Sequence, residues 1–223
     1  WRGVELIRRM YSGPFTPDIH ERTRAVALSP DGMLLAAAAE DGTVGLWDAA
    51  TGRKRLNLPE KQTDQMCLAF SPDGKTLLTN DGRQARLWNV RTGTCRHTLS
   101  GHEGSIRCAA FSADGAALAT AAQDGRIKLW DPASGAATAS LLGHADEVAC
   151  VVFSPDGKTL ASASFDRTIK LWNVATAREL LTLEGHSGRV YGLAFSADGR
   201  VLASGGESPT GGGELYLWKT AQE

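Results

Sequence analysis

The chain has 223 residues, of which 42% are hydrophobic and 22% are charged. This length and composition suit a folded chain that buries a sizeable core without disulfides or metals, and they exclude a disordered chain. The formal net charge of −1 argues against DNA, RNA or an anionic membrane as partner, because those surfaces recruit strongly basic proteins. No apolar run of about 18 residues predicts a membrane helix. No secretory leader is expected either, and the first residue is Trp1 rather than Met.

In chain order, the first predicted element is a strand at residues 4–10, and a repeated unit follows it. A Ser-Pro/Ala-Asp-Gly turn recurs five times, with its aspartates at Asp31, Asp73, Asp114, Asp156 and Asp198. A Leu-Trp pair recurs in phase with these turns, with its tryptophans at Trp47, Trp88, Trp130, Trp172 and Trp218. The chain therefore contains five repeat units, each about 42 residues long.

Each unit is predicted to form four short antiparallel strands. In the third unit these strands cover residues 105–111, 116–121, 126–130 and 137–142. Asp-Gly turns between apolar runs are a strong hairpin signal, and four strands in about 42 residues are typical of one propeller blade. The run Val148–Phe153 is almost continuously apolar, which indicates a sheet covered on both faces. No segment keeps a helical period for ten residues, so a helical solenoid is excluded.

Further motifs accompany the turns. Gly-His pairs stand at Gly101-His102, Gly143-His144 and Gly185-His186, and Trp-Asp endings stand at Trp47-Asp48 and Trp130-Asp131. With these motifs the chain resembles the WD-repeat (WD40) family over nearly its whole length. The resemblance implies an all-β propeller of five four-stranded antiparallel blades, forming one domain over residues 1–223. Either these blades close as a five-bladed ring, or they are part of a larger seven-bladed propeller.

The resemblance also implies a buried hydrogen-bond network of His, Ser or Thr, Asp and Trp in each blade. The third and fourth units carry complete sets: His102, Thr120, Asp124 and Trp130, then His144, Ser162, Asp166 and Trp172. Physical chemistry supports such a network independently, because a buried indole N–H and imidazole need partners. The fifth unit keeps His186, Ser204 and Trp218 but lacks the turn Asp. We expect the first unit to be the weakest, because Ala37 stands where the hydroxyl belongs.

The histidines and aspartates recur once per repeat, whereas a catalytic group is needed only once. We therefore expect a structural role for them, no enzymatic activity and no catalytic residue. The sequence has no nucleophile elbow, P-loop or His-Glu-x-x-His motif, and no cofactor is expected.

Three cysteines occupy one repeated position, three residues before a phenylalanine: Cys67, Cys108 and Cys150. Other units place Ala25 and Gly192 there, so the position favours a small apolar side chain. No Cys-x-x-Cys pair is present, which argues against zinc and any other metal site. Free thiols favour a reducing compartment, and we expect the protein to be cytoplasmic.

The resemblance implies that partners bind the propeller face formed by two sets of loops, those before the first strand and those between the second and third strands. The candidate partner-binding residues on this face are Arg22, Arg24, Met66, Arg107, Phe165, Arg189 and Tyr191. Side chains of these types are enriched at binding hot spots. If the ring closes directly, Arg189 would neighbour Arg22 and Arg24, and this basic arc would suit an acidic or phosphorylated peptide. The alternative is an ordinary solvated rim.

Two insertions, within residues 12–21 and 205–214, are expected on the same face. The last unit ends after its third strand, so the strand at residues 4–10 could complete that blade and remove an exposed sheet edge. The alternative is a fragment of a longer propeller, which the usual seven blades of the family favour.

The predicted function is a non-catalytic scaffold for protein or peptide partners, as a module of a larger signalling protein. It would be a monomeric domain or part of a longer chain. The alternative is small-ligand binding or enzymatic activity at the central channel.

Overall fold

The structure is a computed structural model that describes residues 23–59 and 67–219. Within these ranges all regular structure is β, with 19 strands in five antiparallel sheets. No helix in these ranges is long and apolar enough to cross a membrane. The predicted all-β fold is confirmed. In the third unit the predicted strands agree with the observed ones to within two residues.

The first blade comprises β1 (Thr23–Leu28), β2 (Leu34–Ala39), β3 (Val44–Asp48) and β4 (Lys54–Asn57). The second comprises β5 (Leu68–Phe70), β6 (Thr76–Asp81), β7 (Gln84–Asn89) and β8 (Cys95–Leu99). The third comprises β9 (Ile106–Phe111), β10 (Leu118–Ala122), β11 (Ile127–Trp130) and β12 (Ala137–Leu141). The fourth comprises β13 (Val148–Phe153), β14 (Thr159–Ser164), β15 (Ile169–Asn173) and β16 (Arg178–Leu183). The fifth comprises β17 (Val190–Phe195), β18 (Val201–Glu207) and β19 (Gly213–Lys219).

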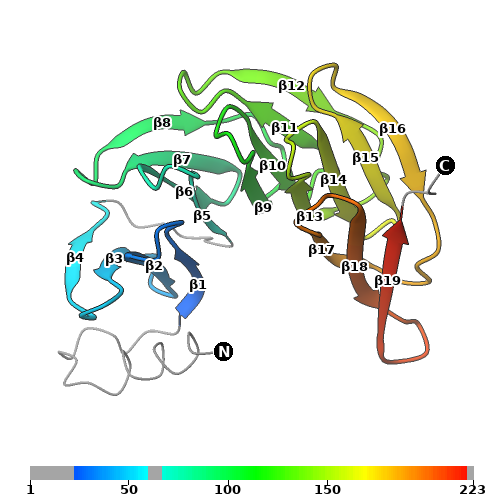
Figure 1. Cartoon of the computed structure of the whole chain (residues 1–223), viewed down its shortest axis with the longest axis horizontal. Helices are drawn as coiled ribbons and strands as arrows, with labels where there is room; N and C mark the ends of the chain where they lie inside the picture. Colours follow the sequence, from blue (N-terminus) through cyan, green and yellow to red (C-terminus); the bar gives the residue numbers. More distant parts are fainter. Residues whose placement is uncertain (1–22, 60–66, 220–223) are drawn as a thin grey trace.

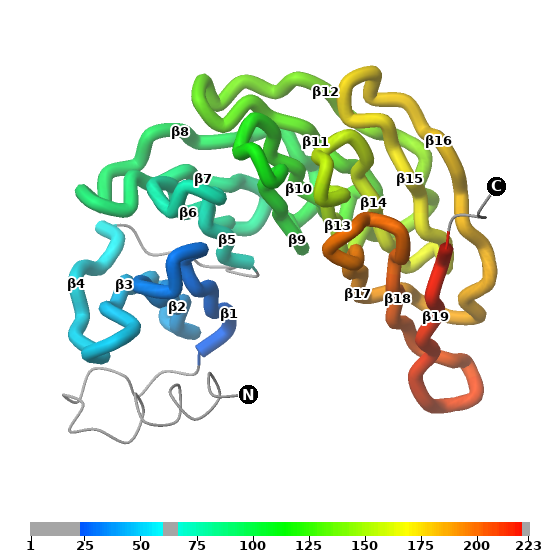
Figure 2. Tube along the Cα trace, in the orientation of Figure 1, coloured from blue at the N-terminus to red at the C-terminus, as the bar shows by residue number. Residues whose placement is uncertain are grey.

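The five blades follow one another along an arc (Figure 1). In each of the first four, the strands lie side by side in chain order, with the first strand innermost and the fourth on the outside. The inner strands pack in succession, β1 on β5, β5 on β9, β9 on β13 and β13 on β17. The first and fifth blades form the two ends of the arc, and the ring is not closed by the described residues (Figure 2). Residues 4–10 lie outside the described ranges, so their closing role stays a prediction.

The repeated Ser-x-Asp-Gly turn joins the inner strand of each blade to the second strand. In the second blade the Ser71 hydroxyl donates to Asp73 Oδ1 at 2.6 Å, and the Lys75 N–H donates to the same oxygen at 3.0 Å. Gly74 adopts a φ of +68°, which favours glycine, and its N–H donates to the Ser71 carbonyl at 2.9 Å. The serine bond, followed by the backbone N–H bond, lowers the pKa of the exposed Asp73 carboxyl. Local bonds therefore fix the shape of the turn.

Each tryptophan from the second blade onward packs against the preceding blade. Trp88 lies in a cluster with Val44 and Leu46 of the first blade, and Trp130 in one with Leu87 of the second. Such clusters of apolar side chains span each junction between neighbouring blades. The stability of each sheet therefore depends on its neighbours.

The two ends of the arc expose apolar side chains. Val26 and Leu28 of the first blade are 55% and 58% exposed, and Leu215 and Leu217 of the fifth are 75% and 62% exposed. Trp47 of the first blade is only half-buried, whereas Trp88 is fully buried. The described blades thus cover one another but leave the outward faces of the two end blades uncovered.

A polar contact also links the second and third blades. Asn80 is fully buried; its Oδ1 accepts from Cys67 N at 2.9 Å, and its Nδ2 donates to the Ile106 carbonyl at 3.2 Å. The Asn80 side chain thus holds the residue that precedes β5 and links it to β9 of the next blade.

We predict that Asn80→Ala destabilises the protein by about 1–3 kcal/mol, because buried backbone groups lose a partner. Thermal unfolding followed by circular dichroism measures this loss as a lower melting temperature. Asn57→Ala, at an exposed position of β4, is the matched control and should leave the melting temperature unchanged. Equal melting temperatures for the two variants would contradict the predicted role of Asn80.

Candidate functional site

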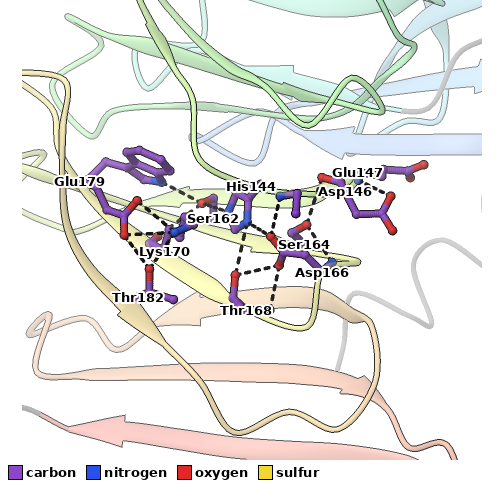
Figure 3. A network of polar contacts seen from close by, with 12 residues as sticks. His144, Asp146, Glu147, Ser162, Ser164, Asp166, Thr168, Lys170, Glu179 and Thr182 are labelled. Atoms are coloured by element: carbon purple, nitrogen blue, oxygen red, sulfur yellow. Dashed lines mark hydrogen bonds and ion pairs between the residues drawn. The ribbon is translucent and has the colours of Figure 1, made fainter.

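A network of polar contacts runs through the fourth blade (Figure 3). Trp172 Nε1 donates to Ser162 Oγ at 2.8 Å, and Ser162 Oγ lies 2.8 Å from His144 Nε2. His144 Nδ1 lies 2.8 Å from Asp166 Oδ2, which also accepts from the Ala145 N–H at 3.0 Å. The network therefore connects the loop before β13 to β14, β15 and the turn between them.

The direction of these bonds follows from the donors. Because an indole N–H can only donate, the serine oxygen accepts from Trp172, and its own proton is directed to His144 Nε2. His144 then carries its proton on Nδ1 and donates it to Asp166, so the network fixes the tautomer. Burial raises the pKa of Asp166, but the bonds from His144, Thr168 and Ala145 outweigh it and hold that pKa well below its usual value.

The third blade repeats this geometry. Trp130 Nε1 donates to Thr120 Oγ1 at 2.9 Å, Thr120 Oγ1 lies 2.8 Å from His102 Nε2, and His102 Nδ1 lies 3.0 Å from Asp124. Burial lowers the pKa of His102, because a buried imidazolium loses hydration, and this effect exceeds the opposing bond to Asp124. The neutral histidine is therefore the favoured form.

The Ser–His–Asp order invites comparison with a hydrolase triad. However, the hydroxyls of Ser162 and Thr120 are in fully buried residues, and each already accepts from an indole N–H. A nucleophile must reach its substrate. The geometry therefore suits a structural network, as the once-per-repeat recurrence predicts.

The fifth blade lacks the turn aspartate, as the sequence shows, but it does not lack a carboxylate. Glu214 of β19 supplies one: its Oε2 lies 3.3 Å from His186 Nδ1 and accepts from Ser187 N at 2.9 Å. His186 Nε2 lies 2.7 Å from Ser204 Oγ, which accepts from Trp218 Nε1 at 2.8 Å. The insertion in this blade removes the turn aspartate, and the longer glutamate side chain reaches the histidine from the next strand. The available signal was Glu214 itself, the acidic residue at the end of the insertion.

The first two blades surround their tryptophans with other groups than this His–Asp pair. In the second, Trp88 Nε1 donates to Thr79 Oγ1 at 2.8 Å, and Asp81 forms an ion pair with Arg86 at 3.3 Å. In the first, Ala37 offers no hydroxyl to Trp47, whose ring instead lies 5.3 Å below Lys54 Nζ. The first blade thus lacks the indole–hydroxyl bond that the other four share.

Of the candidate partner-binding residues, three come together at the junction of the fourth and fifth blades. The rings of Phe165 and Tyr191 meet edge to face with centroids 5.2 Å apart, and Arg189 Cζ lies 4.9 Å from the Phe165 centroid. Tyr191 donates its hydroxyl proton to Glu207 Oε2 at 2.9 Å, and Arg189 Nε lies 3.8 Å from Glu207 Oε1. We call Phe165, Arg189, Tyr191 and Glu207 the aromatic cluster.

The other candidates are dispersed. Arg24 pairs with Glu40 at 3.4 Å, and Arg107 Nε lies 2.6 Å from Glu147 Oε1 of the next blade. Arg22 and Met66 lie outside the described residues. Arg24 and Arg189 stand in the two end blades of an open arc, so the structure does not bring them together as a basic arc. The sequence did not indicate that carboxylates would pair with these arginines.

The insertion at residues 205–214 contributes Glu207 to the aromatic cluster. It lengthens the β18–β19 hairpin, in which Glu207 pairs with Gly213, and a turn closes it through Ser208 N and the Gly212 carbonyl at 3.0 Å. Because Tyr191 contacts Glu207, the hairpin and the aromatic cluster lie next to each other. That they lie on the partner-binding face stays a prediction. The insertion at residues 12–21 lies outside the described ranges.

The WD40 family model, described as the WD domain, G-beta repeat, matches residues 15–48, 54–89, 93–131, 135–173 and 177–219. The chain belongs to the WD40 family. Residues 54–89 contain β4 of the first blade and β5 to β7 of the second, so one WD40 repeat spans two neighbouring blades. WD40 domains are in general non-enzymatic scaffolds that bind proteins or peptides.

Among curated proteins, Coronin-7 of Mus musculus is similar to part of the chain. The two are 48% identical over 46 residues, which is 21% of this chain and 5% of Coronin-7. The similarity thus covers about one repeat and a small part of that relative.

We predict that Asp166→Ala lowers the stability of this WD40 domain by about 1–3 kcal/mol, because it leaves buried donors without an acceptor. Glu214→Ala should also lower the melting temperature, since Glu214 plays the same part in the fifth blade. Glu103→Ala, at a side chain that is 71% exposed, is the control. A melting temperature for Asp166→Ala equal to that of Glu103→Ala would contradict the network's role.

A pH dependence follows from His102. Because its folded-state pKa is lowered from the usual 6.5, the unfolded chain binds this proton first as the pH falls. The contribution to stability is therefore complete well above pH 6.5 and declines below it. We expect the melting temperature to fall between pH 7 and pH 5, and His102→Gln, which cannot titrate, to show a flatter dependence. Parallel profiles for the two proteins would refute this assignment.

Proposed function

We propose that this WD40 domain is a protein-interaction module whose loop face binds a protein or peptide partner at the aromatic cluster. The observation that carries the proposal is the assembly of Phe165, Arg189 and Tyr191 from two blades into one contact. Tyrosine and arginine are enriched among the residues that supply most binding energy, and phenylalanine is enriched at interfaces.

The aromatic cluster is exposed enough to meet a partner and is held in place before binding. Tyr191 is 46% exposed, and the side chain of Arg189 is 54% exposed. Glu207 fixes the tyrosine hydroxyl, and the ring of Phe165 supports both neighbours. Such preorganisation lowers the conformational entropy that a side chain loses when a partner binds.

The chemistry of the partner is a finer part of the proposal. Arg107 lies only 2.6 Å from its carboxylate, whereas Arg189 lies 3.8 Å from Glu207. Arg189 therefore has N–H donors to offer to an acidic or phosphorylated residue of the partner. In a basic arc several arginines would bind the acidic residue of the partner together. We assign this binding to Arg189 alone.

We further propose that the module is non-catalytic, acts within a larger signalling protein and works in a reducing compartment such as the cytoplasm. The four cysteines are all free thiols, which supports that setting. The near-zero net charge supports a protein partner over nucleic acid or an anionic membrane.

A peptide library selected on the immobilised protein, followed by affinity measurements with the selected peptides, tests the proposal. We expect Phe165→Ala and Tyr191→Ala each to weaken binding about 30-fold, as the loss of a hot spot of about 2 kcal/mol does. Leu180→Ala and Arg178→Ala, at exposed positions of the outer strand β16, are controls that should keep full affinity. Loss of binding in the controls but not in the two cluster variants would overturn the proposed face.

The acidic preference has its own test. Selected peptides that carry Asp, Glu or phosphoserine should lose affinity with Arg189→Ala, and Arg189→Lys should restore part of it, because lysine keeps the charge but not the paired donors. Unchanged affinity in Arg189→Ala would refute the acidic preference and leave the aromatic contact standing.

A further inference from the structure

Ser-Pro pairs occur four times in the chain, and the structure gives them two different environments. Three belong to the repeated turn, where the serines are buried: Ser29, Ser71 and Ser154. Each of these three hydroxyls donates to the aspartate of its own turn. The fourth pair, Ser208-Pro209, lies in the insertion of the fifth blade and is not part of such a turn.

Ser208 begins the tip of the β18–β19 hairpin and is half-buried. Among the described residues its hydroxyl contacts only that of Thr210, at 3.0 Å. Two backbone bonds close the tip, from Ser208 N to the Gly212 carbonyl at 3.0 Å and from Gly211 N to the Ser208 carbonyl at 3.1 Å. Pro209, Thr210 and Gly211 are exposed. The tip can therefore open with the loss of few contacts.

A protein kinase needs a serine whose segment can leave its own fold and enter the kinase cleft. The turn serines do not meet this need, because each hydroxyl also accepts a backbone N–H that holds the turn, as Ser154 accepts from Thr159 at 3.0 Å. Ser208 meets it, and Pro209 directly after it completes the dipeptide that proline-directed kinases accept.

The aromatic cluster lies directly beside this serine. Ser208 follows Glu207, whose N–H donates to the Arg189 carbonyl at 2.9 Å and whose carboxylate contacts Tyr191 and Arg189. The charges of Arg189 and Glu207 sum to zero, whereas a phosphoserine carries about −2 at pH 7. A phosphate one residue from Glu207 would therefore make this part of the surface strongly negative over the Debye length of about 8 Å.

We propose that Ser208 is a phosphorylation site for a proline-directed protein kinase, and that its phosphate weakens the binding of acidic partners at the aromatic cluster. The second part rests on the proposed function. In the transfer, Ser208 Oγ attacks the γ-phosphorus of ATP held by the kinase, and the bond from that phosphorus to the β–γ bridging oxygen breaks. ADP leaves, and the hydroxyl proton passes to the catalytic carboxylate of the kinase. The products are phosphoserine, ADP and one proton.

Treatment with a purified proline-directed kinase and ATP, followed by mass spectrometry, tests the modification without any partner. We expect phosphate on Ser208 and none on Ser29, Ser71 or Ser154, which share the Ser-Pro sequence but have buried hydroxyls. Thr210→Ala should still accept phosphate at Ser208. Absence of phosphate from Ser208, or equal phosphate on the turn serines, would overturn the site.

Affinity measurements with the selected peptides, before and after phosphorylation, test the effect of the phosphate. We expect acidic peptides to bind about fivefold more weakly to the phosphorylated protein, with a smaller difference at high salt, and neutral peptides to bind equally. Ser208→Ala, treated with kinase in the same way, is the matched control. It keeps Thr16-Pro17, which lies outside the described residues, so a phosphate there affects both proteins alike. Equal affinity of both wild-type forms for acidic peptides would contradict the effect.

A titration of the phosphorylated protein followed by phosphorus nuclear magnetic resonance needs no peptide. A phosphoserine has a second pKa of about 6, and a nearby guanidinium favours its dianion. The pKa of this phosphate should therefore be lower in the wild type than in Arg189→Ala. Equal values would overturn the link between the phosphate and Arg189. If no peptide binds the unmodified protein, the proposed function fails, while mass spectrometry and this titration still decide the site and its link to Arg189.

Discussion

The rest of the structure depends on how each tryptophan is buried between two blades while its one polar atom is satisfied. Trp172 packs on the preceding blade and donates its N–H to Ser162 of its own blade. In this blade the hydroxyl that accepts the indole proton directs its own proton to a histidine, and the histidine donates to a carboxylate. The polar atom of one indole is thus linked to three further residue types. Through them it connects the loop before the inner strand to the turn before the third strand.

The histidine needs a carboxylate oxygen within reach, and this oxygen can come from different sequence positions. The fifth blade meets this need with Glu214, which comes from β19 instead of the turn, because a side chain longer by one methylene offsets the displaced backbone. The first blade does not meet it in the same way, since Ala37 has no hydroxyl and Trp47 is only half-buried. The cost of an unpaired indole N–H is smaller where the ring still touches water.

The fold could be predicted because its signals are local and repeated: the Ser-x-Asp-Gly turn is held by bonds within five residues, as around Asp73. The complete networks of the third and fourth blades were predictable for the same reason. Glu214 was missed because a search by spacing looks for an aspartate at a fixed position. The pairing of Arg107 with Glu147 was missed because the partners are 40 residues apart and meet only when two blades pack.

Repetition has opposite effects at the rim and on the inner strands. At the rim, positions that are equivalent by repeat differ in chemistry, so Phe165 of one blade can meet Arg189 and Tyr191 of the next and form a surface that no single repeat encodes. On the inner strands, one repeated position carries a small side chain in every blade, as Ala25, Cys108 and Gly192 show. The periodicity that makes the fold easy to predict thus also creates chemistry between blades, which becomes visible only when the repeats are read as neighbours in space.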